Sequence, residues 1–111
     1  MIIVQGYIPI RAERREEALG MARRMTTATR DEPGCISYDF FVGLSDPNTL
    51  MLFQEWENME SLLAHFQTDH MDEFMRGLPN VVSGEVVTRR YAVQSVDEEK
   101  QPGSGDTPTI H

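Results

Sequence analysis

The spacing of apolar residues changes repeatedly along the first 94 residues, and these changes limit the possible folds more than any other feature. Segments rich in β-branched and aromatic residues predict four strands, at 2–10, 35–44, 49–57 and 83–94. Helical spacing of apolar residues predicts one helix over Arg11–Arg30 and another from near Asn58 to Arg76. This order predicts an α+β fold, the ferredoxin-like βαββαβ pattern, with an antiparallel sheet and both helices on one face.

Turn and cap residues separate these segments. Asp31-Glu32-Pro33-Gly34 is expected to end the first helix, and Asp46-Pro47-Asn48 marks a hairpin turn. Asn58 is a good N-cap for the second helix, which Leu78-Pro79-Asn80 is expected to end. Thr68-Asp69 is a second competent N-cap pair, so the second helix either runs unbroken or restarts there.

Composition predicts one domain and a tail. A chain of 111 residues with 40% hydrophobic content fits one compact domain, which we place at residues 1–94. Residues 95–111 are rich in Gly, Pro, Ser, Thr and acid, and predict a flexible acidic tail. No apolar run approaches the roughly 18 residues of a membrane helix, and the N-terminus lacks a secretory pattern, so we expect a cytoplasmic protein.

Charge and motifs exclude several functions. With 10 basic and 18 acidic residues, the formal charge is −8, which disfavours nucleic acid or an anionic membrane as a partner. A single cysteine, Cys35, forms neither an intramolecular disulfide nor a cysteine-based zinc site. The absence of GxGxxG, Walker A, HExxH and nucleophile-elbow motifs disfavours a dinucleotide site and a serine hydrolase. We therefore expect no metal and no cofactor.

Several predicted strands carry apolar residues on both faces. In the second strand, Ile36, Tyr38, Phe40 and Val42 are expected on one face, opposite Cys35 and Phe41. Two helices cover only one face of a sheet, and a large uncovered apolar face usually marks an interface. We therefore expect a homodimer that packs sheet against sheet.

The candidate site residues are polar or aromatic groups expected between the sheet and the helices, namely Gln5, Tyr38, Trp56, His65 and His70. In an unbroken second helix, His70 falls near the middle of an apolar arc formed by Met59, Leu62, Leu63, Phe66 and Phe74. It is then either a buried neutral histidine bonded to a carbonyl, or a general base beside a substrate. His65 falls about 130° from the centre of that arc, at the helix margin. Its five-residue separation from His70 supports a metal pair only weakly.

Two segments resemble the antibiotic biosynthesis monooxygenase superfamily, namely EPGCISYDFF (Glu32–Phe41) and FQEWENMESLLAHFQTDHMDEF (Phe53–Phe74). With the opening strand, the resemblance covers residues 1–94 and implies a dimeric α+β barrel. Some members resemble cofactor-independent oxygenases that convert quinols or anthrones to quinones, others degrade haem, and a few are isomerases. Trp56 matches the strand-three tryptophan of the quinol oxygenases, whereas Leu52 replaces their usual asparagine. In the haem-degrading branch, the pocket tryptophan falls on His65, the first-strand asparagine on Gln5 and the axial histidine on Met75.

The sequence thus predicts a cofactor-independent monooxygenase that oxidises a small aromatic quinol, phenol or polyketide-type substrate with O2. The predicted catalytic residues are His70, His65 and Trp56, with His70 as the base; the predicted substrate-binding residues are Gln5, Tyr38, Phe66, Leu52 and Phe74. The alternatives are a non-catalytic dimeric protein that binds aromatic metabolites, a haem-degrading monooxygenase and a small-molecule isomerase.

Overall fold

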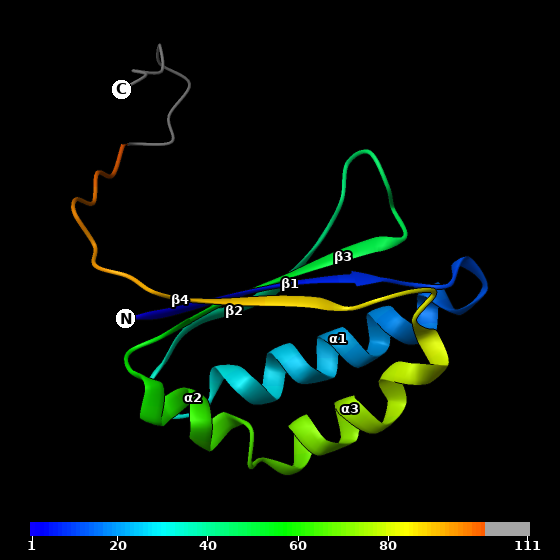
Figure 1. Ribbon diagram of the computed structural model, residues 1–111, viewed down its shortest axis with the longest axis horizontal. Coiled ribbons are helices and arrows are strands. Elements are labelled where there is room, and N and C mark those ends of the chain that lie inside the picture. Colours follow the sequence, from blue (N-terminus) through cyan, green and yellow to red (C-terminus); the bar gives the residue numbers. More distant parts are fainter. Residues whose placement is uncertain (102–111) are drawn as a thin grey trace.

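The computed structural model describes residues 1–101, and its elements follow the predicted order (Figure 1). The strands are β1 (Ile2–Pro9), β2 (Cys35–Val42), β3 (Thr49–Trp56) and β4 (Val87–Ala92). The helices are the short 3-10 helix η1 (Ala12–Arg14), α1 (Arg15–Arg30), α2 (Met59–His65) and α3 (Asp69–Val81). Of the predicted tail, residues 95–101 form no helix or strand, and 102–111 lie outside the described residues.

The four strands form one antiparallel sheet in the order β2-β3-β1-β4. All three α-helices lie on the same side of this sheet, as Figure 1 shows. The core lies between the two layers, where alternate residues of β1 and β3 are buried because successive side chains of a strand point to opposite faces. The predicted ferredoxin-like fold is confirmed.

No helix formed by the described residues covers the opposite face of the sheet. By alternation and register, this open face consists of Ile3, Gln5, Tyr7, Ser37, Asp39, Phe41, Met51, Phe53, Glu55, Val87, Arg89 and Tyr91. Phe41 and Tyr91 are 47% and 44% exposed. Gln5 pairs here with Phe53 and Arg89, so the prediction that its side chain faces the helices is wrong.

A bulge changes the predicted alternation at the start of β2. Cys35 pairs with Trp56, but the next pair is Ser37 with Glu55, so Ile36 is an extra residue. Cys35 consequently packs on the helix side with Tyr38, and Ile36 is 51% exposed. The prediction that Ile36 and Tyr38 share a face opposite Cys35 is therefore wrong.

The second predicted helix is two helices. Asn58 Oδ1 accepts from the Ser61 backbone N–H at 2.8 Å and so caps α2, as predicted, while Thr68 caps a separate α3. Met59 and Leu63 are exposed, contrary to the arc expected for one continuous helix. Pro79 does not end α3, which continues to Val81. No helix among residues 1–101 is long and apolar enough to cross a lipid bilayer.

Candidate functional site

Glu32 lies between two histidines and accepts a hydrogen bond from each. Its Oε2 is 2.8 Å from His65 Nδ1 and 2.6 Å from His70 Nε2. The side chains of Glu32, His65 and His70 are 12%, 1% and 26% exposed, respectively. The cluster therefore reaches from the interior, at His65, to the surface, at His70.

Local capping brings these three residues together. Helix α1 ends at Arg30, and Gly34, with φ 82°, turns the chain just after Glu32. The Glu32 carboxylate meets His65 at the end of α2 and His70 near the start of α3. At the break between α2 and α3, the Thr68 hydroxyl donates to the His65 carbonyl at 2.8 Å and accepts from the Met71 N–H at 3.3 Å. This break lies between the two histidines and changes their relative orientation. His65, predicted at the margin of one continuous helix, is therefore buried.

The hydrogen bonds assign a tautomer to each ring. An ionised carboxylate only accepts, so His65 donates through Nδ1 and His70 donates through Nε2. In neutral rings the lone pairs then lie on His65 Nε2 and His70 Nδ1. The former is buried and has no hydrogen-bond partner among residues 1–101. No residue in the described part of the chain bonds the latter, and it belongs to the more exposed ring.

His65 is enclosed by aromatic rings. Its ring centroid lies 5.0 Å from that of Trp56, 5.8 Å from Tyr38 and 6.0 Å from Phe66. Burial lowers the pKa of His65 below its ordinary value, because the apolar surroundings oppose the charged ring; the hydrogen bond and charge of Glu32 act in the opposite direction. His65 is therefore a neutral donor that helps to hold the Glu32 carboxylate in place.

Apart from Phe74, the apolar and aromatic side chains predicted to hold a substrate lie in the core or are covered by other side chains. Trp56 is fully buried, and its indole N–H donates to Gln54 Oε1 at 2.8 Å. Tyr38 is 2% exposed, and burial, followed by the negative charge of Glu32, raises its pKa far above the ordinary value. Leu52 is also buried, and the Arg90 guanidinium covers Phe66 at 4.9 Å from the ring centroid. Trp56, Tyr38 and Phe66 thus pack around His65, and none of these side chains lines the groove beside His70.

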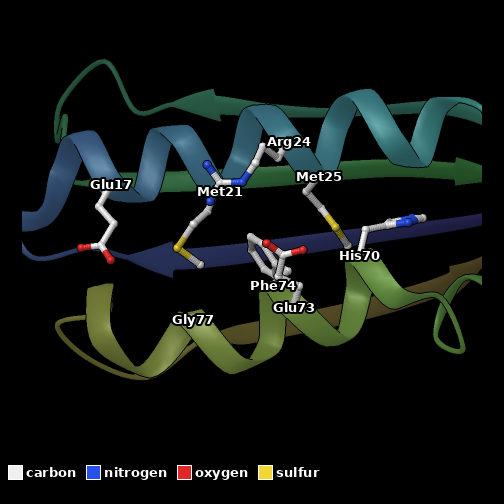
Figure 2. A pocket seen from close by; sticks show the side chains of 8 residues that line it. All are labelled: Glu17, Met21, Arg24, Met25, His70, Glu73, Phe74 and Gly77. Carbon is white, nitrogen blue, oxygen red and sulfur yellow. The ribbon is translucent and has the colours of Figure 1, made fainter.

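The accessible space beside His70 is a groove between α1 and α3. Its volume is about 190 Å³, and it is lined by Glu17, Met21, Arg24, Met25, His70, Glu73, Phe74 and Gly77. Figure 2 shows His70 at one end of this groove and Glu17 at the other. Of the predicted substrate-binding residues, only Phe74 lines it.

The sequence reasoning missed Glu32 as a functional residue. The structure brings the predicted residues His65, His70, Trp56 and Tyr38 to this carboxylate or around it, whereas Gln5 lies on the open face. The signal was an acidic residue directly before Pro33-Gly34. We assigned Glu32 to a helix stop and to the segment that resembles the family, but gave it no role at the site, although a buried histidine needs a hydrogen-bond partner.

Glu32, His65 and His70 also offer three ligand atoms within 4.8 Å of one another. The distances of 2.6 and 2.8 Å are hydrogen-bond lengths, whereas neighbouring ligands around a tetrahedral zinc ion lie about 3.3 Å apart. A ligating histidine normally donates through its second ring nitrogen, and no described residue accepts from His65 Nε2. The arrangement therefore fits two hydrogen bonds to one carboxylate oxygen better than it fits a bound metal ion.

Comparisons with known proteins agree with this architecture. The sequence model of the family "Antibiotic biosynthesis monooxygenase" matches residues 1–77. The "Uncharacterized protein sll1783" of Synechocystis is 30% identical over 92 residues, which span 83% of this chain and 63% of that protein. The "Putative monooxygenase YcnE" of Bacillus subtilis is 32% identical over 75 residues, 68% of this chain and 79% of that protein.

A solved structure shows the same fold. The conserved protein from Methanosarcina mazei superimposes with a TM-score of 0.80 at 26% identity, covering 84% of this chain and 92% of that one. The family match extends from β1 to Gly77 in α3, and so includes Glu32, both histidines and both walls of the groove. This chain belongs to the antibiotic biosynthesis monooxygenase family.

Proposed function

We propose that this protein is a cofactor-independent monooxygenase that oxidises a small aromatic quinol or phenol with O2, and that His70 is its general base. The observation that carries the proposal is the 2.6 Å hydrogen bond from His70 Nε2 to Glu32 at the end of the groove. The carboxylate fixes the tautomer and leaves the lone pair of Nδ1 free to accept a proton. A histidine with one ring nitrogen held by a carboxylate and the other accessible can act as a general base.

The proposed reaction begins when a substrate hydroxyl gives its proton to His70 Nδ1. The resulting phenolate is electron-rich and transfers electrons to O2. For a quinol, one oxygen atom forms a new bond to a ring carbon and the other leaves as water, so quinol and O2 give hydroxyquinone and water. The substrate itself supplies all four electrons, and the chemistry needs neither a flavin nor a metal.

The other cluster members have positioning roles in this proposal. Glu32 holds His70 and, as an anion, stabilises the imidazolium that forms when Nδ1 takes the proton. His65 donates a second hydrogen bond to Glu32 from the core, and its neutral ring adds no competing positive charge. Met21, Met25 and Phe74 supply an apolar wall beside the base, and such surroundings strengthen interactions with the phenolate by excluding water.

The experiment is oxygen consumption with a panel of quinols, in the presence of a chelator, by the wild type and His70→Gln. A glutamine amide retains a donor toward Glu32 but has no basic nitrogen. We expect turnover in the wild type, one labelled oxygen atom from ¹⁸O2 in the product, and a fall in kcat of at least about tenfold in His70→Gln. Asp69→Asn, an exposed neighbour, is the matched control and should retain activity.

The possible results separate the alternatives. Full activity in His70→Gln would show that the base is elsewhere, and activity lost on chelation would show that a metal is required. Quinols that bind to the wild type without oxygen uptake would favour a non-catalytic dimeric binding protein. Circular dichroism and thermal melting of both variants establish that any loss arises from chemistry and not from unfolding.

A further inference from the structure

The groove beside His70 has apolar walls suited to one aromatic ring. Met21 and Met25 from α1 face Phe74 from α3, and methionine sulfur makes favourable contacts with aromatic rings. A buried cavity of about 150 Å³ is sufficient for benzene, so a groove of about 190 Å³ suits a single substituted ring. Fused three-ring substrates exceed this space.

The charges along the groove are not equivalent. Glu17, at the end far from His70, already pairs with Arg14 at 3.3 Å. Arg24 on α1 and Glu73 on α3 lie between the two ends in Figure 2, and neither forms an ion pair within the described residues. Arg24 is the only Arg or Lys among the described residues that line this groove.

No hydrogen bond or ion pair within residues 1–101 engages Arg24, which distinguishes it from most other arginines. Arg11, Arg14 and Arg15 each donate to a backbone carbonyl, and Arg30 pairs with Asp39. Arg76 pairs with Asp72, and Arg90 covers Phe66. The guanidinium of Arg24 therefore retains its full set of planar donors, a geometry that matches a carboxylate in a bidentate manner.

We infer that the groove binds a single-ring hydroxylated aromatic acid, whose carboxylate pairs with Arg24 while its hydroxyl faces His70. Glu73 on the opposite wall repels the carboxylate and so selects one orientation of the ring. The inference rests on the proposed function only for the role of the hydroxyl. Recognition of the acid depends on Arg24 and Glu73 alone.

The test is calorimetric binding under argon, which excludes turnover. The probes are 2,5-dihydroxybenzoate and its methyl ester, which share the ring and hydroxyls but differ in charge. We expect the wild type to bind the acid about tenfold more tightly than the ester, and Arg24→Gln to lose most of that difference. Arg23→Gln is the matched control, because Arg23 is the exposed neighbour on α1 and lines a different groove, toward β2.

The outcomes are distinct from those of the oxygenase test. Equal binding of acid and ester by the wild type, or equal losses in Arg24→Gln and Arg23→Gln, would overturn the inference. Glu73→Gln should raise affinity for the acid more than for the ester, and a fall would likewise contradict it. Selective binding of the acid without oxygen uptake would support the aromatic-acid site while rejecting the proposed monooxygenase.

Discussion

The two imidazoles that donate to one oxygen of Glu32 are not equivalent, because they differ in burial. His65 is enclosed by three aromatic rings, and these surroundings oppose a positive charge on its imidazole. His70 is partly exposed beside a groove. The same Glu32 oxygen therefore supports a fixed neutral donor on one side and an accessible base on the other. A structural ring and a proposed catalytic ring are joined through a single acceptor.

The lowered pKa of His65 predicts that stability falls under mild acid. Below pH 6.5, its ordinary pKa, the unfolded chain protonates His65 while the folded chain resists protonation. The unfolded state then binds more protons, so the free energy of unfolding falls as pH decreases from 6.5 through the lower folded pKa, by at most about 1.4 kcal/mol per pH unit. Urea unfolding from pH 8 to 5 measures this slope.

His65→Asn is the variant for that measurement, because the asparagine amide nitrogen replaces Nδ1 as a donor but does not titrate. The variant should be less stable than the wild type at pH 7 and show a smaller loss between pH 6.5 and 5. Parallel pH curves for the two proteins would mean that His65 titrates in the same way folded and unfolded.

Removing the charge of Glu32 tests whether it organises both rings. In Glu32→Gln, two N–H donors compete for one carbonyl oxygen, and hydrogen bonds to a charged group are worth about 1.5–3 kcal/mol. We expect the free energy of unfolding to fall by about 2 kcal/mol, and the ring nitrogen shifts of both histidines to change in NMR spectra. Glu85→Gln, an exposed loop position, should change stability by less than about 0.5 kcal/mol. Unchanged nitrogen shifts in Glu32→Gln would contradict this role.

At the scale of the elements, the turn between α1 and β2 fixes the position of Glu32. Gly34 has φ 82°, and a Cβ at this position would overlap the Ser61 side chain at the start of α2. The Gly34 carbonyl also accepts from the Glu57 N–H at 2.9 Å. Glycine is therefore required by both backbone conformation and close approach.

Gly34→Ala should consequently destabilise the fold by more than the roughly 1–2 kcal/mol of a left-handed conformation alone, since α2 must also shift. Gly20→Ala is an informative contrast, because the added Cβ makes only ordinary contact within α1 and should stabilise the helix by about 0.5–1 kcal/mol. Chemical denaturation of both variants checks the opposite signs. A Gly34→Ala protein as stable as the wild type would show that the turn relaxes without cost.

The order of the elements could be predicted from the sequence, because apolar spacing and caps are local signals. The wrong predictions concern which face a side chain occupies, at positions where one extra residue or a nonlocal contact decides it. The extra residue Ile36 reversed the face of Cys35, and the restart at Thr68 brought His65 into the core. Residues of the site could be named, but the link through Glu32 could not, because it joins a turn to two later helices.

At the scale of the whole molecule, the open face is the main unexplained surface. Tyr7, Phe41 and Tyr91 are each more than a third exposed there, beside Met51 and Phe53. Soluble monomers seldom expose apolar patches larger than a few hundred Å², and stable interfaces bury about 1,200–2,000 Å² in total. We expect a second copy of this chain to cover the open face, packed face to face about a twofold axis. Two sheet faces pack well against each other, and a twofold axis brings the same face of both copies together.

Light scattering at micromolar concentration should therefore give about twice the chain mass of 12.7 kDa. Phe53 lies near the middle of the open face, paired with Gln5 and Asp39, so Phe53→Glu would bury a charge at the interface and should yield a monomer. Leu63→Glu introduces the same charge at a half-exposed site on α2 and should leave the dimer intact. Circular dichroism confirms that both variants are folded. A wild-type mass of one chain would show that no dimer forms, and dissociation by Leu63→Glu alone would place the dimer contact on the helix side. Loss of the dimer only in Phe53→Glu would assign the open face to a second copy of this chain.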